Sequence, residues 1–376
     1  MTPRQRYIEA LTFGNPDKIP FAPGGGRETT RARWHREGVP EGVHYMDALY
    51  DELGFRPDPP KKPGVSLDVD FRIIPQFEEK ILAHEGGHYL VQDWMGAVTE
   101  ISDFYDYTYI RQAKDFVTRK WHKWPVESRD DWDRIKWRLD PDAPGRFPED
   151  FEDRCRRARD RDWLLRIRCN GPFWQIREWV GFEGLCMLMI DDPDFVTEMA
   201  DTWNDFVSEL LTRICDRVTP DVLGISEDMA YKAHSMISPE MVRKFLKPCY
   251  DRWVKIVGDA GCPIVDMDSD GYIGELIPIW IEAGINVADP IEVAAHNDIV
   301  EFRERFGTDM GYRGGIDKRA IAKGGDVIKE ELERVIPPLL EDGGYIPGCD
   351  HGVPSDVSWE NYVEYARMLA EYTGWL

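Results

Sequence analysis

The spacing of apolar residues alternates along the chain between two patterns, one typical of strands and one typical of helices. From about residue 150, short apolar runs such as 164–168 and 222–226 alternate with longer segments in which apolar residues recur every three or four positions. The longest of these segments, residues 193–217, places its apolar side chains along one stripe, as expected for a helix that covers a core. This alternation of strand and helix predicts a parallel α/β fold.

About seven or eight strands are predicted when residues 18–22 are counted as the first. No glycine-rich nucleotide-binding loop follows that strand, so a closed (β/α)8 TIM barrel is favoured over an open, doubly wound sheet. Residues 1–376 then form a single domain that begins with a helix over residues 2–13. Residues 55–127 predict an inserted antiparallel elaboration or lid near the N-terminal side, from strand-type runs at 71–75, 79–83, 88–92 and 97–101.

Composition and charge exclude several classes of partner. The chain has 70 acidic and 47 basic residues, a net charge of −23, which disfavours nucleic acid or an anionic membrane because both bind basic surfaces. The first residues lack the apolar core of a signal peptide, and no apolar run has the length needed to span a bilayer. The seven cysteines are scattered and odd in number, so a reduced, cytoplasmic protein is predicted.

Polar residues gather just after most of the predicted strands. In a TIM barrel the carboxyl ends of all strands meet at one mouth, where active sites lie. The sequence therefore predicts a site at this mouth that is built from Arg27, Asn170, Glu227, Asp268, Asp270, Arg313, Cys349 and His351. Histidine exchanges protons near neutral pH, which makes His351 a candidate general acid.

Two of these strand ends carry potential metal ligands. The segment Ile264-Val-Asp-Met-Asp-Ser-Asp-Gly271 has three alternating carboxylates, which share one face of a strand and repel each other unless a cation or a shared proton relieves them. The segment 344–354 has the same form, a short strand that ends in Cys349, Asp350 and His351. The alternatives are an aspartate-rich turn that caps a helix, and a proton-sharing pair of acids beside a buried thiol.

The sequence resembles the uroporphyrinogen decarboxylase superfamily over nearly its whole length, which implies a (β/α)8 barrel. The likeness is clearest in Asn170-Gly-Pro-Phe, Glu227-Asp-Met-Ala-Tyr-Lys232, Ser238-Pro-Glu-Met, Phe245-Leu-Lys-Pro and the C-terminal Gly-Cys-Asp-His-Gly-Val-Pro. True decarboxylases hold the acidic porphyrin side chains with an Arg-Gln-Ala-Gly-Arg segment near the N-terminus. Here Pro23-Gly-Gly-Gly-Arg-Glu28 stands in that place, with Arg27 as its one arginine, which argues against a porphyrinogen substrate.

The other branch of the superfamily contains zinc-dependent, corrinoid-linked methyltransferases, whose metal motif is His-X-Cys after one strand and Cys after the last. Asp268-Ser-Asp270 and Cys349 stand at those places, so the resemblance implies a zinc site with two oxygen ligands. Oxygen ligands leave the metal more Lewis-acidic, which suits an oxygen leaving group. The implied activity is transfer of a methyl group from a small methylated substrate, such as a methyl ether, to the cobalt of a corrinoid (cobalamin) on a partner protein.

Within this reading, Glu227 or His351 supplies a proton, Asp350 orients His351, and Arg313 holds an anion. Arg27, Asn170 and Tyr231 are candidates for binding the substrate. Structural roles also stay open. In these, Glu227 caps a helix or forms a salt bridge to Lys232, and Arg313 pairs with acids at a barrel end. Two alternative functions also remain: a metal-independent decarboxylase-like lyase acting on a carboxylated small molecule, and a non-enzymatic corrinoid or small-molecule binder. The sequence is compatible with a monomer or a homodimer.

Overall fold

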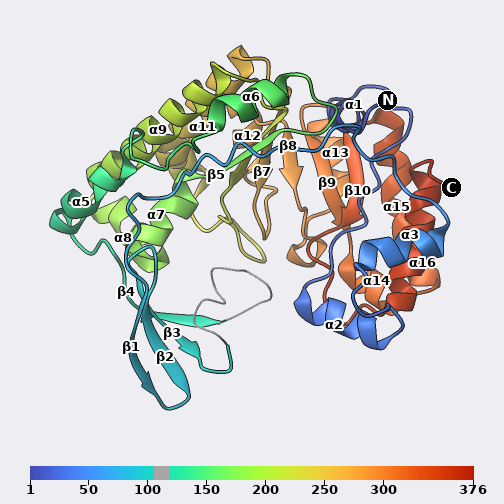
Figure 1. Ribbon diagram of the computed structural model, residues 1–376, viewed down its shortest axis with the longest axis horizontal. Helices are drawn as coiled ribbons and strands as arrows, with labels where there is room; N and C mark the ends of the chain where they lie inside the picture. The colour runs from blue at the N-terminus through green and yellow to red at the C-terminus, as the bar shows by residue number, and fades with distance from the viewer. Residues whose placement is uncertain (106–117) are drawn as a thin grey trace.

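The computed structural model describes residues 1–105 and 118–376, and its centre is a parallel sheet (Figure 1). In this part of the chain the sheet has six strands, which follow one another in chain order. They are β5 (Arg166–Asn170), β6 (Val222–Ser226), β7 (Ile264–Asp268), β8 (Val287–Asp289), β9 (Gly311–Ile316) and β10 (Tyr345–Cys349). Because every pair of neighbours is parallel, the carboxyl ends of all these strands lie at the same edge.

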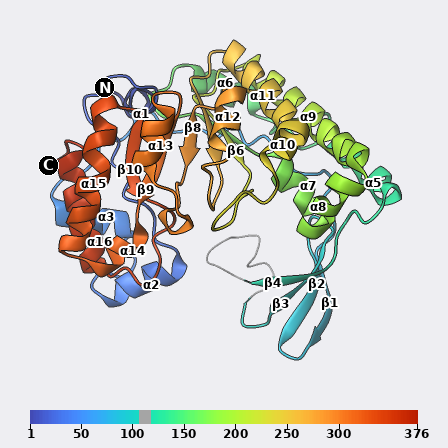
Figure 2. The ribbon, with the colours of Figure 1, turned by 180° about the vertical axis from the view of Figure 1, so that it is seen from behind.

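Helices cover the outer face of the sheet, as both views show (Figures 1 and 2). They are α6 (Phe151–Arg159), α7 (Pro172–Val180), α8 (Phe182–Asp191), α9 (Pro193–Cys215), α10 (Pro239–Met241), α11 (Lys247–Asp259), α12 (Ile277–Ala283), α13 (Ile299–Phe306), α14 (Lys318–Lys323), α15 (Asp326–Asp342) and α16 (Trp359–Tyr372). A short π-helix, Val242–Leu246, joins α10 to α11. The helix predicted over 193–217 is confirmed as α9, whose apolar stripe is buried against the barrel.

The N-terminal end of the barrel is sealed by α1 (Pro3–Leu11). Its Ala10 and Leu11 are buried against the apolar first residues of the strands, Val222, Ile264, Val287 and Ile346. A capping box fixes the start of the helix, because Thr2 accepts from the Gln5 amide while the Gln5 side chain accepts from the Thr2 amide. One end is therefore closed by hydrophobic packing, and the carboxyl end carries the polar residues.

The first predicted strand is the main correction to the barrel. Residues 18–22 form no strand, and extended chain through residue 26 runs beside β10 instead. The Cys349 amide donates to the Pro23 carbonyl over 3.4 Å, and Gly26 forms a bridge with Val353. Prolines 20 and 23 lack the N–H groups that a regular ladder requires, so this segment fills the space next to β10 without joining the sheet as a strand. Two helices, α2 (Glu28–Arg36) and α3 (Tyr45–Leu53), then pack beside α16, with Trp34 stacked 4.4 Å from Tyr362.

The predicted antiparallel elaboration is a four-stranded sheet within the described residues, and it projects from the barrel near α7 and α8 (Figures 1 and 2). Its strands are β1 (Lys80–Glu85), β2 (His88–Gln92), β3 (Val98–Ser102) and β4 (Arg119–Lys123). The run 71–75 is not a strand, whereas β4 was not predicted. Residues 106–117 of the predicted elaboration lie outside the described residues, and its role as a lid stays a prediction. The chain returns to the barrel through α5 (Arg129–Ile135) and a 3₁₀ helix (Lys136–Leu139).

None of the helices in the described ranges combines the length and the apolar character needed to cross a bilayer.

Candidate active site

The interior of this barrel contains charged side chains, whereas the interior of many TIM barrels is apolar. Arg166 of β5 and Arg313 of β9 both pair with Asp266 of β7, the Arg313 nitrogen lying 3.2 Å from the carboxylate. Arg313 is also 3.3 Å from Asp289 of β8. Burial disfavours the charge of Arg313, but Asp289 and Asp266 outweigh burial and raise the pKa of the arginine. Arg313, predicted as an anion-holding catalytic residue, therefore lies in the interior and pairs with core acids, the alternative role considered for it.

Arg168 connects the next layer of residues to the mouth. Asn170, Ser226 and Asp268 lie side by side in the register of β5, β6 and β7. Arg168 donates to the Ser226 hydroxyl over 2.8 Å and forms an ion pair with Asp268. Its neighbour in the register is Gly224, where an added Cβ would come within 2.8 Å of a carboxylate oxygen. That oxygen belongs to Asp266, so a glycine at position 224 leaves room for Asp266 and Arg166 to meet.

On the other side of the mouth, His351 follows β10 and contacts Asp270, which follows β7. The His351 Nε2 atom is 3.3 Å from Asp270 Oδ2, and its Nδ1 atom is 3.4 Å from the Arg27 guanidinium. The hydrogen bond with Asp270 is the main cause that raises the pKa of His351 above its usual value. The Asp270 amide donates to Asp228, whose pKa is raised to about 6 by burial and by the charge of Asp270. Asp228, Asp270 and His351 therefore form a connected group of titratable residues at the mouth, in which the pKa values of Asp228 and His351 are raised.

Cys349 and Asp350, which directly precede His351, are both buried. Cys349 is 6% exposed, and burial raises the pKa of its thiol to about 12, so the thiol keeps its proton at neutral pH. Asp350 is fully buried and accepts from the amides of Val293 and Lys318 at 2.9 and 3.2 Å. Asp350 was expected to orient His351, but Asp270 makes that contact in the structure.

The three predicted metal ligands do not form a metal site in this arrangement. Asp268 is paired with Arg168 and Asp270 contacts His351, while Cys349 is buried. Within the described residues, no group of three or more His, Cys, Asp or Glu side chains is placed to hold a metal ion. The groups that pair with the alternating acids are arginines of β5 and β9 and a histidine in the loop after β10. The zinc site implied by the resemblance stays a prediction. The arrangement of these three side chains in the structure does not fit it.

Glu227, predicted to transfer a proton, lies behind the mouth and is fully buried. It accepts hydrogen bonds from the Tyr250 hydroxyl and, over 2.8 Å, from the amide of Trp174 in the first turn of α7. Burial raises the pKa of Glu227 to about 7. A Cβ at Gly171 would lie 2.1 Å from the carboxyl carbon, so only glycine fits there. This geometry is that of an acceptor at a helix N-terminus, and the carboxyl group does not face the mouth.

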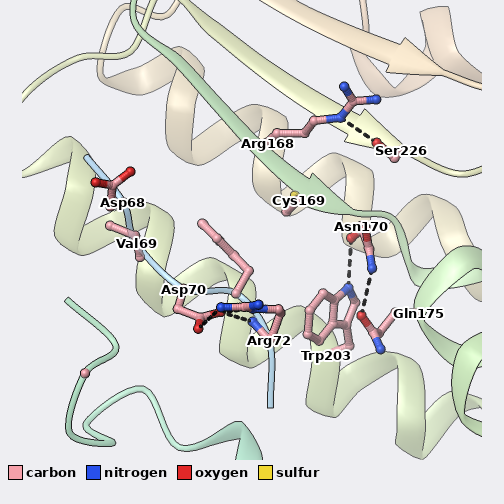
Figure 3. A pocket seen from close by; sticks show the side chains of 12 residues that line it. Asp68, Val69, Asp70, Arg72, Arg168, Cys169, Asn170, Gln175, Trp203 and Ser226 are labelled. Carbon is pink, nitrogen blue, oxygen red and sulfur yellow. Dashed lines mark hydrogen bonds and ion pairs between the residues drawn. The ribbon is translucent and has the colours of Figure 1, made fainter. Parts of the chain in front are cut away.

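A cavity of about 550 Å³ opens beside the ends of β5 and β6 (Figure 3). The residues that give it polar character are Asp68, Asp70, Arg72, Arg168, Asn170, Gln175 and Ser226. Asn170, predicted to bind substrate, donates through its side-chain amide to the Gln175 side chain (Figure 3). Its backbone carbonyl accepts from the Trp203 indole. Tyr231 does not line this cavity; it lies in the loop after β6 and is 55% exposed.

Sequence reasoning missed Arg72 and Arg168, the two arginines of this cavity. Arg72 forms a two-point ion pair with Asp70 at 2.7 and 2.8 Å (Figure 3). For Arg168 a signal was present, because Arg166 and Arg168 alternate within the run Leu164-Leu-Arg-Ile-Arg168. Alternate residues of a strand share a face, so both arginines had to point into the barrel. Arg72 lies in an irregular segment, and no local sequence pattern indicates that this segment passes the ends of the strands.

Comparisons with known proteins agree with this architecture. The family model described as uroporphyrinogen decarboxylase (URO-D) matches residues 123–372. A uroporphyrinogen decarboxylase of Geobacillus kaustophilus (strain HTA426) is 26% identical over 139 residues, which are 36% of this chain and 38% of that protein. The structure is similar to that of a methyltransferase from Methanosarcina mazei, with a TM-score of 0.58, 14% identity and coverage of 99% of both chains. These matches and the parallel sheet confirm the predicted fold class, a TIM barrel with an antiparallel elaboration.

Proposed function

Because the chain belongs to the uroporphyrinogen decarboxylase family, we propose that it is a methyltransferase which removes the methyl group of a small methyl ether. A corrinoid on a separate protein would supply the methyl acceptor. The whole-chain likeness to a solved methyltransferase supports this proposal, since it extends over 99% of both chains. The observation that carries it is the contact between His351 and Asp270 at the mouth.

The reaction requires charge to be neutralised on the oxygen that leaves. Its C–O bond breaks, the methyl carbon passes to the acceptor, and the oxygen takes up a proton to become an alcohol. The contact with Asp270 raises the pKa of His351 above its ordinary value, so the ring keeps its proton to a higher pH than a free imidazole. We assign His351 the role of general acid and Asp270 that of its positioning residue. Arg27, 3.4 Å from Nδ1, restrains the ring from the other side.

In this proposal the cavity beside β5 binds one end of the substrate, and the ether oxygen reaches across the mouth to His351, which does not line the cavity. The cavity volume of about 550 Å³ is in the range of small-molecule sites. Arg168 is fixed by Ser226 and Asp268 yet remains 57% exposed, so its guanidinium can also bind an oxygen of the substrate. Because Asp268, Asp270 and Cys349 do not fit a metal, we assign no step to zinc.

The test combines a panel of small methyl ethers with free cob(I)alamin as the methyl acceptor. Demethylated alcohol should accumulate in step with loss of cob(I)alamin, and the His351→Asn variant should lose most of this activity. The Arg168→Met variant should raise KM more than it lowers kcat, because Arg168 binds substrate and transfers no proton. If no ether in the panel is consumed by the wild-type protein, the proposal fails for that substrate class.

A decarboxylase-like lyase is the second candidate, and one observation favours it. Arg72 and Arg168 both line the cavity, with side chains 60% and 57% exposed, so the pocket can also take a carboxylated small molecule. Release of CO₂ from small carboxylic acids, without any corrinoid, would support this function. Uroporphyrinogen itself should not react, because Arg27 is the one arginine in the segment that otherwise holds its acidic side chains.

A further inference from the structure

The helix α8, Phe182–Asp191, is apolar on nearly every side. Of its ten residues, only Glu183 and Asp191 carry a charge. Leu185 and Met189 form its buried inner face, and the helix packs against α7 and α9. A helix on the surface of a protein normally presents polar residues to solvent, and a helix that is apolar all round is normally buried. The outer face of α8 therefore has the composition of a covered surface.

Three large apolar side chains of this outer face are exposed. Phe182, Met187 and Ile190 are 45%, 54% and 68% exposed. Phe182, Cys186 and Ile190 follow each other at intervals of four residues, and Met187 precedes Ile190 by three, which places these side chains in one row along the helix. The helix lies at the edge of the molecule, near α5 and the antiparallel sheet (Figures 1 and 2). A contiguous apolar surface of this kind marks an interaction site.

A cavity of about 450 Å³ lies beside this row. Met187 and Leu188 of α8 line it, and its other apolar walls are Val126, Val180 and Phe195. Among the described residues, this cavity has no lining residue in common with the cavity beside β5, so it is separate from the candidate active site. The row and the cavity together form a surface into which an apolar side chain of a partner can insert.

The charges around this surface are mainly negative. The charged groups on α8, in the cavity and in the ion pairs of Arg129 are five carboxylates and one guanidinium: Glu127, Glu183, Asp191, Asp192, Glu198 and Arg129. Arg129 is already compensated, because it lies 2.7 Å from Asp192 and 3.2 Å from Glu198. Glu198 also pairs with Lys136, but Lys136 has a second acid, Asp133, so these two residues leave the balance unchanged. The surface therefore favours a partner that brings positive charge.

The same charges disfavour a second copy of the chain as the occupant. In a symmetric contact of α8 with its own copy, Glu183 and Asp191 would meet carboxylates again, because the helix has no basic residue. Like charges placed against each other across an interface are unfavourable. A partner that carries bases beside an apolar stripe fits both the exposed row and its acidic surroundings.

We propose that α8 and the cavity beside it dock a helix of a partner protein, which presents an apolar stripe flanked by lysine or arginine residues. The stripe packs on Phe182, Met187 and Ile190, and one of its apolar side chains fills the cavity. The flanking bases pair with the surrounding carboxylates, which discriminates against apolar helices with acidic flanks. The inference concerns docking alone and does not rest on the proposed transfer reaction.

Three labelled peptides of about 18 residues, or about five turns of helix, test this assignment. The first has leucine and lysine at the spacing of an amphipathic helix, the second replaces its lysines by glutamate, and the third replaces its leucines by serine. Each is titrated with the full-length protein and followed by fluorescence anisotropy. The leucine–lysine peptide should bind saturably at one site per chain, and the other two at least about tenfold more weakly. Equal binding of the leucine–glutamate peptide overturns the charge of the partner, and equal binding of the serine–lysine peptide overturns the apolar docking site.

A paired variant locates the binding. Met187→Ser with Ile190→Ser removes two apolar side chains of the row, so the leucine–lysine peptide should bind at least about tenfold more weakly. The matched control is Ile81→Ser with Leu82→Ser, which removes two side chains of β1 that are each 46% exposed and should bind the peptide like the wild type. Undiminished binding in the α8 variant overturns the proposal.

A second variant tests the charges of the same surface. Glu183→Gln with Asp191→Asn removes the two carboxylates of α8 and should also weaken binding of the leucine–lysine peptide. Both side chains are exposed, so this variant should keep the melting temperature of the wild type and keeps the test valid if the apolar variant does not fold. Unchanged binding in this variant overturns the proposed basic flanks.

Sedimentation equilibrium separates a partner protein from a second copy of the chain. The wild type and the Met187→Ser with Ile190→Ser variant should have the same association state, because α8 docks another protein. A wild-type dimer that dissociates in the variant would make α8 a contact between copies and overturn the proposal. None of these measurements involves methyl transfer, so their failure leaves the proposed function untouched.

Discussion

The Nε2 atom of His351 lies 3.3 Å from Oδ2 of Asp270, although the two residues follow strands that are not neighbours. His351 comes after β10 and Asp270 after β7, with β8 and β9 between them in the sheet. The contact therefore crosses the mouth and joins the loop after β7 to the loop after β10. It also sets the protonation of the imidazole, because the carboxylate raises the pKa of His351.

Replacing Asp270 by asparagine should shift the pH dependence of methyl transfer. With His351 as the acid, activity falls as the pH rises through the pKa of the imidazole. Because Asp270 raises that pKa, the fall should begin at lower pH in the Asp270→Asn variant. Replacing His351 itself by asparagine should lower kcat by about 10²-fold or more, the scale of general acid catalysis. The measurement is kcat between about pH 5.5 and 9, which brackets ordinary histidine titration.

The control for this profile is Asp205→Asn, which removes an exposed acid of α9 that pairs with Arg252 on the outer face. It should keep the wild-type profile. If Asp270→Asn also keeps it, Asp270 does not act through the proton of His351, and its role is structural.

Elemental analysis tests the zinc site implied by the resemblance. Asp268 and Asp270 already have partners in Arg168 and His351, so we expect substoichiometric zinc after zinc-supplemented expression. The Cys349→Ser variant should then have the same zinc content as the wild type. Stoichiometric zinc that disappears in both Cys349→Ser and Asp270→Ala would show that the ligands rearrange around a metal, as the sequence predicted.

The elements that sequence reasoning found are those whose pattern comes from burial. β6 was predicted at its observed bounds, and α9 within two residues of its end, because buried strands and helix stripes leave apolar periodicity in the chain. The strand Arg119–Lys123 was missed because it is exposed along most of its length and its sequence has no apolar alternation. The segment 18–22 was wrongly predicted as a strand. Its short apolar run suggested one, but Pro20 lacks the N–H group that a strand donates to its neighbour.

The candidate site was predictable in its acids but not in their partners. The alternation of Asp266, Asp268 and Asp270 correctly indicated carboxylates that need a compensating charge. Which cation supplies that charge depends on the register of β5, β7 and β9 and on the loop after β10, which no local pattern shows. The arginines that pair with Asp266 are about 50 and 100 residues away along the chain.

Removing the central acid of the barrel interior should destabilise the fold. Asp266 is 2% exposed and compensates both Arg166 and Arg313, so Asp266→Asn leaves two largely buried guanidinium groups short of negative charge. We expect a loss of about 3 kcal/mol in the free energy of unfolding, the scale measured for broken buried pairs. Denaturant unfolding measures it. The control Asp251→Asn removes an exposed partner of Lys247 and should change the value by less than about 0.5 kcal/mol; an equally small loss for Asp266→Asn would show that the interior pairs are well solvated.

Replacing Glu227 by glutamine should make the protein more stable at alkaline pH. The pKa of this buried carboxyl is raised from 4.5 to about 7 in the folded state, so between these values the folded chain binds more protons than the unfolded chain. Stability therefore falls as the pH rises through this window, in total by on the order of 3 kcal/mol. Glutamine keeps an acceptor for the Trp174 amide and carries no charge, so it removes this loss.

The measurement is the free energy of unfolding in urea at about pH 5 and pH 8, compared between the wild type and Glu227→Gln so that other titrating groups cancel. The variant should lose less stability between the two values, by on the order of 3 kcal/mol. The exposed Glu341→Gln should match the wild type within about 0.5 kcal/mol at both. The same variant bears on catalysis: Glu227 faces Tyr250 and α7, so methyl transfer should persist in Glu227→Gln. Loss of activity without a change in the pH dependence of stability would return Glu227 to the catalytic role that its position in the sequence suggested.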